Sequence, residues 1–535
     1  MSSAPRTGVP ETGRRPDLWV LGVSGALLIT FVLAALVAPT RVGAAVDTAF
    51  AWSARWFGAY WQVLLLGTLA VAAVLAFSRY GRVRMGGTDT PGFSWFRWVA
   101  MVLTTLLAAG GVFWAAAEPL AHYVDPPPQY AQVEGGMEGA ALALAQSFVH
   151  WGFPAWAIGG SLATLVMMRG VEKGMPLRPR TLLWPIMGER VRTHWIGTVA
   201  DISCVVAVVA GTVGPIGFLG LQMSYIGGEM FGVGSGFGTQ VAIIVGLTVV
   251  ATISVLSGLD RGIQLLSRIN VWAALILIVC VVGLSSLPYV VDLFLQASAV
   301  HVREFVPMTL FRGDEQWLGY WTVFFFGWFI GYGPIMAIFI ARISKGRTVR
   351  QIFVGATVLP AVVTSVWFTA LGGSGLWLEQ NDPGVVSGPY AEDGLPAAAL
   401  AIVQALPLST VLALVMVVVT LIFFAATLDA MSYSISSASM RSGEPFAWVR
   451  AFWCVGMGAA AIVLLTVGDN GVQALQSFIV VTAVPVGLIL LPALWSAPRL
   501  VREMAVEQGI VTVPGPGSAT DAETTAGTGT GVRVG

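Results

Sequence analysis

The stretch WTVFFFGWFIGYGPIMAIFIARISKGRTVR, residues 321–350, indicates the fold class most directly. It begins as an apolar, aromatic run of about 20 residues, the length that crosses a bilayer, and it ends in clustered Lys and Arg at 342–350. Such a cationic end marks the cytoplasmic side of a membrane span. The Gly-Tyr-Gly-Pro sequence at 331–334 predicts a break at mid-depth, where freed backbone groups need partners from protein or a water-lined cavity. The stretch therefore predicts a broken membrane helix with an aromatic binding surface.

The composition also indicates a membrane protein. The 535 residues are 56% apolar and only 10% charged, with a mean hydropathy of +0.79, whereas soluble domains are about a quarter charged. The formal net charge is zero, which argues against nucleic acid as a partner. Cys204, Cys280 and Cys454 lie in apolar runs without metal-ligand spacing, which favours packing roles over disulfides.

Twelve apolar runs predict twelve membrane-spanning helices. The first, at 18–38, is too long for the core of a signal peptide and is interpreted as a span. With both termini cytoplasmic, only Arg41, Arg55, Arg303 and Arg312 among the Lys and Arg residues face outward, the bias expected of a plasma or inner membrane protein. The other predicted spans lie at about 57–78, 95–118, 139–168, 196–226, 238–257, 268–290, 316–341, 351–377, 408–438, 447–467 and 471–496.

Three segments are predicted to lie outside the spans. Residues 1–17 form a polar N-terminal tail, and residues 499–535, rich in Gly, Thr, Ala and Pro, form a disordered C-terminal tail. Residues 291–315 hold an amphipathic stretch, VDLFLQASAVHVREFV at 291–306, and an outer loop. This stretch is consistent with a helix in the plane of the membrane interface, and equally with an ordinary outer loop that contains some helix.

The candidate binding residues are aromatic. The fourth span (QSFVHWGFPAWAIGG) places Trp151 and Trp156 around a proline that is expected to kink the helix and turn both indoles inward. The eighth span contributes Trp328, Phe329 and Tyr332. Aromatic faces around a shared cavity bind a quaternary ammonium through the ring quadrupole, at about 1–2 kcal/mol per contact when desolvated. The alternative is simple packing, since the chain has 20 Trp and 27 Phe, and only the coincidence with helix breaks favours a cage.

Two other spans hold further candidates. In the third span, Ala108 and Gly110 would let the helix unwind and expose N–H groups to an anionic ligand group. In the tenth span, Asp429 is a functional candidate because of its depth, or it bonds to neighbouring backbone or hydroxyl groups and only locks the helix. The four histidines are scattered without an i, i+4 pair for a metal, and no nucleophile or acid–base constellation is evident, so the sequence does not predict an enzyme.

Several motifs resemble those of the betaine/choline/carnitine transporter (BCCT) family over about 18–500. The best match is Trp321-Thr322 … Gly327-Trp328, followed by ARISKGRTVR at 341–350. The supporting motifs are HW…WAI at 150–158, Glu118-Pro119, GLDRGI at 258–263, and FFAATLD at 423–429 in the place of a Phe-Phe-x-Thr-Ser-Ala-Asp motif.

The resemblance implies an all-α integral membrane protein with a leucine-transporter-type core of two inverted five-helix repeats. Two peripheral transmembrane helices at 18–90 would precede the repeats, which would occupy 91–290 and 316–498. The resemblance further implies a homotrimer, alternating access and a small methylated ammonium substrate such as glycine betaine, choline or carnitine. It implies no organic cofactor.

This sequence departs from the family pattern at the cage. The family's eighth span carries Trp-Trp-x-x-Trp, whereas the matching residues here are Trp328, Phe329 and Tyr332, and Gly159 replaces a Tyr of the fourth span. The cage is therefore expected to be wider and less rich in tryptophan. The third span has Leu-Ala-Ala-Gly at 107–110 in the place of the family's Gly-Met-Gly-x-Gly run.

The resemblance also implies two ion sites whose ligands are only partly kept. One site retains Thr212 but has Val208 where a Thr is usual. A hard cation such as Na⁺ needs several oxygen ligands, by analogy with other hard cations, so coupling to Na⁺, to H⁺ or to counter-substrate stays open. The other site would draw on Thr104, Leu107, Phe423, Ala426 and Thr427, with Ala426-Thr427 in the place of a Thr-Ser pair.

The sequence thus predicts a secondary active transporter that imports a quaternary-ammonium or related methylated osmolyte. The alternatives are a substrate exchanger of the same family and an osmotically gated channel or sensor on the same scaffold. The retained Trp151 and Trp156 favour transport, because a sensor need not keep a cage. The C-terminal tail has only Arg499, Arg502 and Arg533 as cations, which argues against strong osmotic activation through a basic tail.

Overall fold

The computed structural model describes residues 15–106, 108–133, 135–257, 260–467 and 471–511, and this part of the chain is almost entirely helical. Its one small sheet pairs β1 (Arg15–Pro16) with β2 (Met440–Ser442) in antiparallel fashion. Asp17 caps the first helix by accepting a hydrogen bond from the N–H of Val20 at 3.5 Å. Residues 15–17, predicted as part of a free tail, are thus tied to the folded body.

The helices of the first half follow the predicted apolar runs, with short 3₁₀-helical turns (η) in the connecting loops. In chain order they are α1 (Leu18–Val37), α2 (Pro39–Phe77), η2 (Arg79–Arg82), α3 (Trp95–Leu106), α4 (Ala108–Val124), η3 (Pro128–Tyr130), α5 (Gly136–Trp151), α6 (Phe153–Gly160), α7 (Leu162–Glu172), η4 (Pro179–Leu183), α8 (Trp184–Met187), η5 (Gly188–Arg192), α9 (Trp195–Phe231), α10 (Phe237–Ser257), α11 (Asp260–Leu284) and α12 (Leu287–Leu310).

The second half contains three π-helical stretches, η6, η7 and η8, within its membrane helices. Its elements are α13 (Glu315–Leu318), η6 (Gly319–Val323), α14 (Phe324–Ile343), α15 (Val349–Phe353), η7 (Val354–Val358), α16 (Leu359–Phe368), η8 (Thr369–Gly373), α17 (Ser374–Asn381), α18 (Ser387–Asp393), η9 (Leu395–Ala397), α19 (Ala398–Gln404), α20 (Ser409–Ala438), α21 (Ala447–Leu465), α22 (Gly471–Leu490) and α23 (Ala493–Glu507).

Ten helical stretches among the described residues are long and apolar enough to cross a membrane. The number rises to eleven when Trp272–Leu284 and Leu287–Leu310, which are bent by 102° relative to each other, count as one span. The third predicted span is divided between α3 and α4, which lie on either side of residue 107. The predicted all-α, multi-pass membrane fold is confirmed, while the count of twelve spans stays a prediction.

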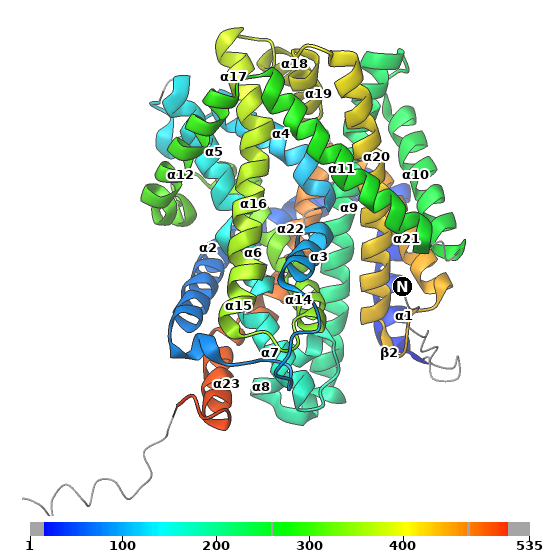
Figure 1. The fold of residues 1–535 in the computed structure, drawn as a ribbon. Coiled ribbons are helices and arrows are strands. Elements are labelled where there is room, and N and C mark those ends of the chain that lie inside the picture. Colours follow the sequence, from blue (N-terminus) through cyan, green and yellow to red (C-terminus); the bar gives the residue numbers. More distant parts are fainter. Residues whose placement is uncertain (1–14, 107, 134, 258–259, 468–470, 512–535) are drawn as a thin grey trace, which may run out of the picture.

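The two described ends of the chain lie at the same end of the bundle. Figure 1 shows α17, α18 and α19 at one end, and α7, α8, β2 and α23 at the other. The N-terminal β1 pairs with β2, and α23 packs against α7. The two described ends therefore lie on one side of the bundle, and the assignment of that side to the cytoplasm stays a prediction.

The amphipathic stretch at 291–306 lies inside α12. This helix turns sharply away from α11 and packs against α5, and it occupies the periphery of the bundle in Figure 1. Of the two sequence interpretations, the structure therefore shows a continuous helix rather than a loop. Its position in the plane of the membrane interface stays a prediction.

The predicted break in the fourth span is present. Helix α5 ends at Trp151, and α6 begins at Phe153 with Pro154 in its first turn. Proline is tolerated there because the first N–H groups of a helix have no intrahelical partner. A Cβ on Gly152 would collide with the Phe148 carbonyl oxygen, so the tight junction depends on glycine.

The predicted break at 331–334 in the eighth span is wrong. Helix α14 continues through Pro334 to Ile343, and the irregular segment is instead the π-helix η6, which precedes it. The glycines serve close packing rather than unwinding. A Cβ on Gly333 would lie 3.0 Å from Leu490 Cδ1 and 3.7 Å from Ile158 Cγ1, because α14 passes between α22 and α6.

The C-terminal tail begins later than predicted. Residues 499–507, assigned to a disordered tail from composition, belong to α23. This helix is amphipathic, and it buries Leu500, Val501 and Met504 against the bundle. Glu507 also forms an ion pair with Arg169 of α7 at 2.5 Å. The tail prediction for residues 512–535 falls outside the described residues.

Candidate functional site

The break in the fourth span places Trp151 at the centre of an aromatic cluster. Its indole Nε1 donates a hydrogen bond to Glu118 Oε2 of α4 at 2.8 Å. Its ring meets Trp328 edge-on, with centroids 5.6 Å apart and planes at 76°, and it meets Phe329 at 5.5 Å and 90°. These geometries are the edge-to-face arrangements that aromatic quadrupoles favour. Trp151 is therefore held by a hydrogen bond at one end and by two rings of α14 at the other.

The eighth span contributes rings that are held by α9. Trp328 Nε1 donates to the Gly211 carbonyl oxygen at 3.0 Å, and the Tyr332 hydroxyl lies 3.0 Å from Thr212 Oγ1. A Cβ on Gly211 would lie 2.7 Å from Tyr332 Cε2, so glycine is needed for α9 and α14 to approach this closely. Two neighbouring residues of α9 thus position two of the predicted cage residues.

The structure brings together only part of the predicted cage. The ring of Trp151 contacts the rings of both Trp328 and Phe329. Tyr332 lies one helical turn after Trp328 on α14. Trp156 is buried, but in the described part of the chain it forms no ring contact with them, and its Nε1 has no hydrogen-bond partner. The reason is the break at Gly152, which places Trp156 on α6, whereas Trp151 ends α5.

Rings that sequence reasoning missed complete the cluster. Phe368 of α16 lies 5.3 Å from Trp151, and Phe325 lies 5.4 Å from it. Phe324 stacks on Trp328 at 5.5 Å with planes at 29°. The triple Phe at 324–326 is a local signal that could have identified two of them. Phe368 had no such signal, because only the packing of α16 brings it close.

The predicted ion ligands are only partly assembled. Thr427 of α20 is buried, and its Oγ1 has no hydrogen-bond partner among the described residues, while Phe423 and Ala426 of the same helix are half-buried. Thr212 Oγ1 donates to the Val208 carbonyl oxygen at 2.7 Å and also contacts Tyr332, so it is linked to the cage instead.

Four predicted residues of the third span fall outside this description. Leu107 is outside the described residues. The side-chain surroundings of Thr104, Ala108 and Gly110, on either side of it, are outside them too. The roles assigned to these four residues stay predictions.

The interpretation of all four histidines as scattered is wrong for two of them. His150 Nδ1 lies 2.6 Å from Glu118 Oε1, and His122 Nε2 lies 3.4 Å from the same oxygen. All three side chains are fully buried. Glu118 and His122 are four residues apart on α4, a signal that the sequence carried, whereas His150 arrives only through the packing of α5 on α4. We call these three residues the acid–imidazole cluster; it contacts the cage directly through Trp151.

A second buried charged group lies at the end of the bundle that holds the termini. Arg178 pairs with Asp17 at 2.9 Å and with Asp201 at 2.8 Å, and Arg180 Nε pairs with Asp201 at 2.7 Å. We call these four residues the inner ion-pair cluster. Burial by itself would raise the pKa of Asp17, but the hydrogen bond and charge of Arg178 outweigh it, and the pKa is lowered from its ordinary value.

Asp429 of α20 forms an ion pair with a neighbouring helix. Its carboxylate pairs with Arg450 Nη2 of α21 at 2.6 Å, and both side chains are partly accessible. The pair joins α20 to α21 away from the aromatic cluster. The structure thus gives this acid a role in helix packing, but its partner is an arginine of another helix, which the sequence did not predict.

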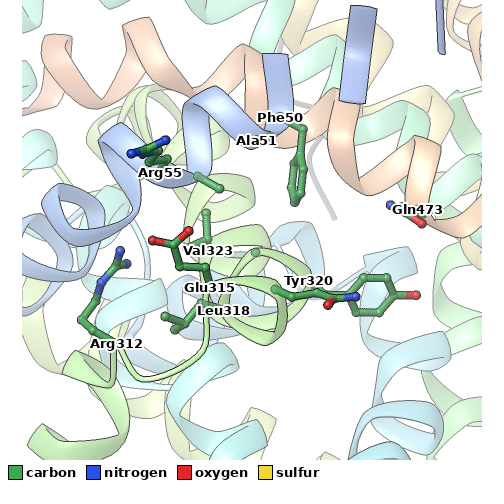
Figure 2. A pocket seen from close by; sticks show the side chains of 12 residues that line it. Phe50, Ala51, Arg55, Arg312, Glu315, Leu318, Tyr320, Val323 and Gln473 are labelled. Atoms are coloured by element: carbon green, nitrogen blue, oxygen red, sulfur yellow. The ribbon is translucent and has the colours of Figure 1, made fainter. Parts of the chain in front are cut away.

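A cavity of about 340 Å³ lies between α2, α22 and the start of the eighth span. Figure 2 shows Arg55, Glu315 and Arg312 along one side of this cavity, and Phe50, Tyr320 and Gln473 along the other. Arg55 and Arg312 are two of the four cations that were predicted to face outward. They therefore converge on a single cavity beside the eighth span.

Ten or eleven described helical stretches long and apolar enough to cross a membrane define a multi-pass membrane protein. A family profile described as BCCT, betaine/carnitine/choline family transporter, matches residues 19–506, and the chain belongs to this family. The family and the named relatives are transporters, not enzymes.

The relatives match over most of their length. The chain is 47% identical to glycine betaine transporter 2 of Vibrio parahaemolyticus, over 93% of this chain and 92% of the relative. It is 33% identical to a glycine betaine/proline/choline/ectoine transporter of the same organism, over 83% and 78%. A solved Na⁺-coupled sialic acid symporter is similar at a TM-score of 0.45 and 13% identity, over 82% of this chain and 87% of that one.

Proposed function

We propose that this chain imports a methylated ammonium osmolyte by alternating access, with glycine betaine as the first candidate. The observation that carries the proposal is the contact of Trp151 with Trp328 and Phe329, which joins the fourth and eighth spans in one aromatic cluster. The relative named glycine betaine transporter 2 supports this choice of substrate, given its 47% identity over nearly the whole chain.

The chemistry of the cluster suits a trimethylammonium group. Such a head group has no hydrogen to donate, so it is recognised by aromatic faces, at about 0.5–2 kcal/mol for each cation–π contact. Both tryptophans have their N–H groups occupied, Trp151 by Glu118 and Trp328 by Gly211. The indoles are therefore fixed by hydrogen bonds, which lowers the entropy lost when they close around a ligand.

The partial replacement of tryptophan affects selectivity. Phe329 and Tyr332 are half-buried and smaller than the Trp residues that the family carries there. A cage built with them leaves more room around the trimethylammonium group that glycine betaine, choline and carnitine share, so all three are candidate substrates.

Ion coupling is the finer part of the proposal. A buried hydroxyl without a partner is costly, and a bound cation would satisfy Thr427 Oγ1. We propose a Na⁺ site at Thr427, with H⁺ as the alternative coupling ion. The other residues of this site are Phe423, Ala426, Thr104 and Leu107.

The remaining family features complete the proposal. They are an inverted five-plus-five repeat, a homotrimer whose interfacial helix is α12, and a cell-membrane location with both termini cytoplasmic. The single-sided position of β1 and α23 is consistent with this topology.

The test is uptake of radiolabelled glycine betaine, choline and carnitine into proteoliposomes, at fixed pH, with and without a Na⁺ gradient. We expect saturable uptake of at least one substrate, with counterflow, and stimulation by inward Na⁺. Counterflow without any dependence on an ion gradient would assign an exchanger. Flux that neither saturates nor shows counterflow would assign a channel, and no uptake of any methylated ammonium compound would reject the substrate class.

A further inference from the structure

The acid–imidazole cluster places a buried carboxylate beside the cage without a fixed positive charge. In the described part of the chain, the ionisable groups within ion-pairing distance of Glu118 are His122 on its own helix and His150 of α5. The other neighbours of the cluster, Trp317 of α13 and Trp321 and Thr322 of η6, do not titrate. Among the other described elements packed against α4, namely η8, η9, α9, α16, α17, α19 and α20, no Lys, Arg, Asp or second Glu pairs with Glu118.

The hydrogen bonds assign the protons of this arrangement. His150 Nε2 lies 3.0 Å from Gln146 Nε2, and an amide nitrogen can only donate. His150 Nε2 therefore accepts, its Nδ1 carries the hydrogen, and Nδ1 donates to Glu118 Oε1 at 2.6 Å. In this state the cluster consists of an anionic carboxylate and a neutral His150, with Trp151 Nε1 donating to the other carboxylate oxygen.

The same cluster has room for one more proton. Both ring nitrogens of the fully buried His122 are without a hydrogen-bond partner in the described structure, although Nε2 is 3.4 Å from Glu118 Oε1. Gln146 Oε1 is also unpartnered, so rotation of its amide would present an acceptor to a protonated His150 Nε2. Thr322 Oγ1, 3.0 Å from this nitrogen, can accept as well. The surrounding groups thus satisfy either protonation state.

A metal ion does not fit these positions. Two ligands bound to one Zn²⁺ at about 2.0–2.1 Å with a tetrahedral angle lie about 3.3 Å apart. The 2.6 Å between Glu118 Oε1 and His150 Nδ1 is too short for that, and it is typical of a charge-assisted hydrogen bond. The geometry is therefore that of a shared proton.

We propose that Glu118, His150 and His122 form a proton-binding site linked to the aromatic cage, and that binding of one proton weakens binding of a methylated ammonium ligand. The inference rests on the proposed function, since it concerns the affinity of that same cage. It adds a second ligand, the proton, and a direction for its effect.

Two effects of the added proton both weaken ligand binding. A cationic ligand beside Trp151 is attracted by the carboxylate, and an added proton cancels that charge in a region of low dielectric. The proton also turns the Trp151–Glu118 bond from a charge-assisted hydrogen bond into a neutral one, which is about half as strong and holds the indole less firmly. By linkage, ligand binding must then release a proton to the same extent that protonation weakens binding.

The test is calorimetric binding of glycine betaine and of choline to the purified protein from about pH 5 to pH 8, the range over which histidine sites titrate. Neither ligand changes charge across this range. We expect Kd to rise on the acid side by up to about tenfold per pH unit, the limit for one linked proton. Titrations in buffers of different ionisation enthalpy should show release of up to one proton per ligand.

Two variants make the readout specific. Glu118→Gln removes the carboxylate that shares the proton and attracts the ligand, while both imidazoles remain, and it should reduce both the pH dependence of Kd and the proton release well below the wild-type values. Glu304→Gln is the matched control; Glu304 hydrogen-bonds to the Tyr130 hydroxyl at 3.2 Å, outside the cluster, and the variant should keep the wild-type pH profile. If Glu118→Gln does not fold, the number of protons that the wild type releases on ligand binding still tests the proposal.

Failures of the two proposals are distinguishable. Measurable binding with a flat pH profile and no proton release would overturn the proton site and leave the proposed function standing. Tighter binding at acid pH would overturn the proposed sign. No binding of either ligand at any pH would reject the proposed function itself.

Discussion

The two buried charged clusters differ in the kind of cation that faces the carboxylate. In the inner ion-pair cluster, Asp17 and Asp201 face Arg178 and Arg180, and a guanidinium stays charged at every physiological pH. In the acid–imidazole cluster, the ionisable partners of Glu118 among the described residues are two imidazoles, which, unlike a guanidinium, can gain or lose a proton. The side chains of the two clusters are similarly buried. The charges of the first cluster are fixed, whereas the second cluster can gain or lose a proton. Only the second touches the cage.

The inner ion-pair cluster also has a mechanical role. Asp17 begins α1, Arg178 and Arg180 lie in the loop after α7, and Asp201 lies in the second turn of α9. The cationic loop after α7 therefore has a structural role besides the topological one predicted from sequence. Two of its cations join three separate segments.

The largest expected effect is a loss of stability when the inner ion-pair cluster loses an arginine. Arg178→Ala leaves two buried carboxylates short of a partner, and it should cost about 3–5 kcal/mol of unfolding free energy. Unfolding in mixed detergent micelles measures this loss. Arg441→Ala is the matched control, because Arg441 is largely exposed and 3.6 Å from Asp17; it should cost at most about 1 kcal/mol. An equal loss of unfolding free energy in the two variants would show that the buried ion pairs stabilise the protein no more than an exposed one does.

The next effect lies in the cage. Trp328→Ala removes one aromatic face and should weaken glycine betaine binding by about 1–2 kcal/mol, or roughly 5- to 30-fold in Kd. Trp328→Phe keeps an aromatic face and should recover part of the affinity. Trp448→Ala, on the exposed face of α21, should bind like the wild type. An unchanged Kd for Trp328→Ala would assign this residue to packing.

A smaller effect is expected where α9 meets the cage. Thr212→Val removes the contact between Thr212 Oγ1 and the Tyr332 hydroxyl, a single hydrogen bond worth about 1 kcal/mol. Substrate affinity should fall about fivefold at fixed Na⁺. A change in the Na⁺ dependence of uptake, without a change in substrate affinity, would instead assign Thr212 to an ion site.

The smallest effect is a pH response that should be absent. Because the pKa of Asp17 is lowered in the folded protein, its contribution to stability is present above the unfolded pKa, about 3.9, and is lost only as pH falls through the lower folded value. Asp17 should therefore cause no change in the melting temperature between about pH 8 and pH 5. A drop in that window that Asp17→Asn abolishes would contradict the assignment.

The sequence predicted what depends on hydropathy and local chemistry. Apolar runs gave the membrane helices, and Pro154 indicated the break that places Trp151. The predicted break at 331–334 failed because glycine and proline have two uses in membrane helices, unwinding and close packing, and only the neighbouring Leu490 shows which one applies. The tail at 499–507 failed because composition does not reveal the surface that α23 covers.

The site was predictable to a lesser extent. Trp151, Trp328 and Phe329, whose rings the structure brings together, could be selected from sequence because aromatic residues coincide with the helix break and with family motifs. Trp156 lies apart from them, since one residue of non-helical backbone reorients everything that follows it. His150 could not be assigned to Glu118 from spacing alone, because 32 residues separate them and only the packing of α5 on α4 brings them together.

The central claim is that the aromatic cluster recognises the positive charge of a methylated ammonium group. The most direct measurement compares the Kd of glycine betaine with that of tert-butylacetate, which has the same shape but carbon in place of the charged nitrogen. The account predicts that glycine betaine binds at least about tenfold more tightly, a difference of about 1.4 kcal/mol. Equal affinities would show that the cluster selects for shape alone and would contradict the account.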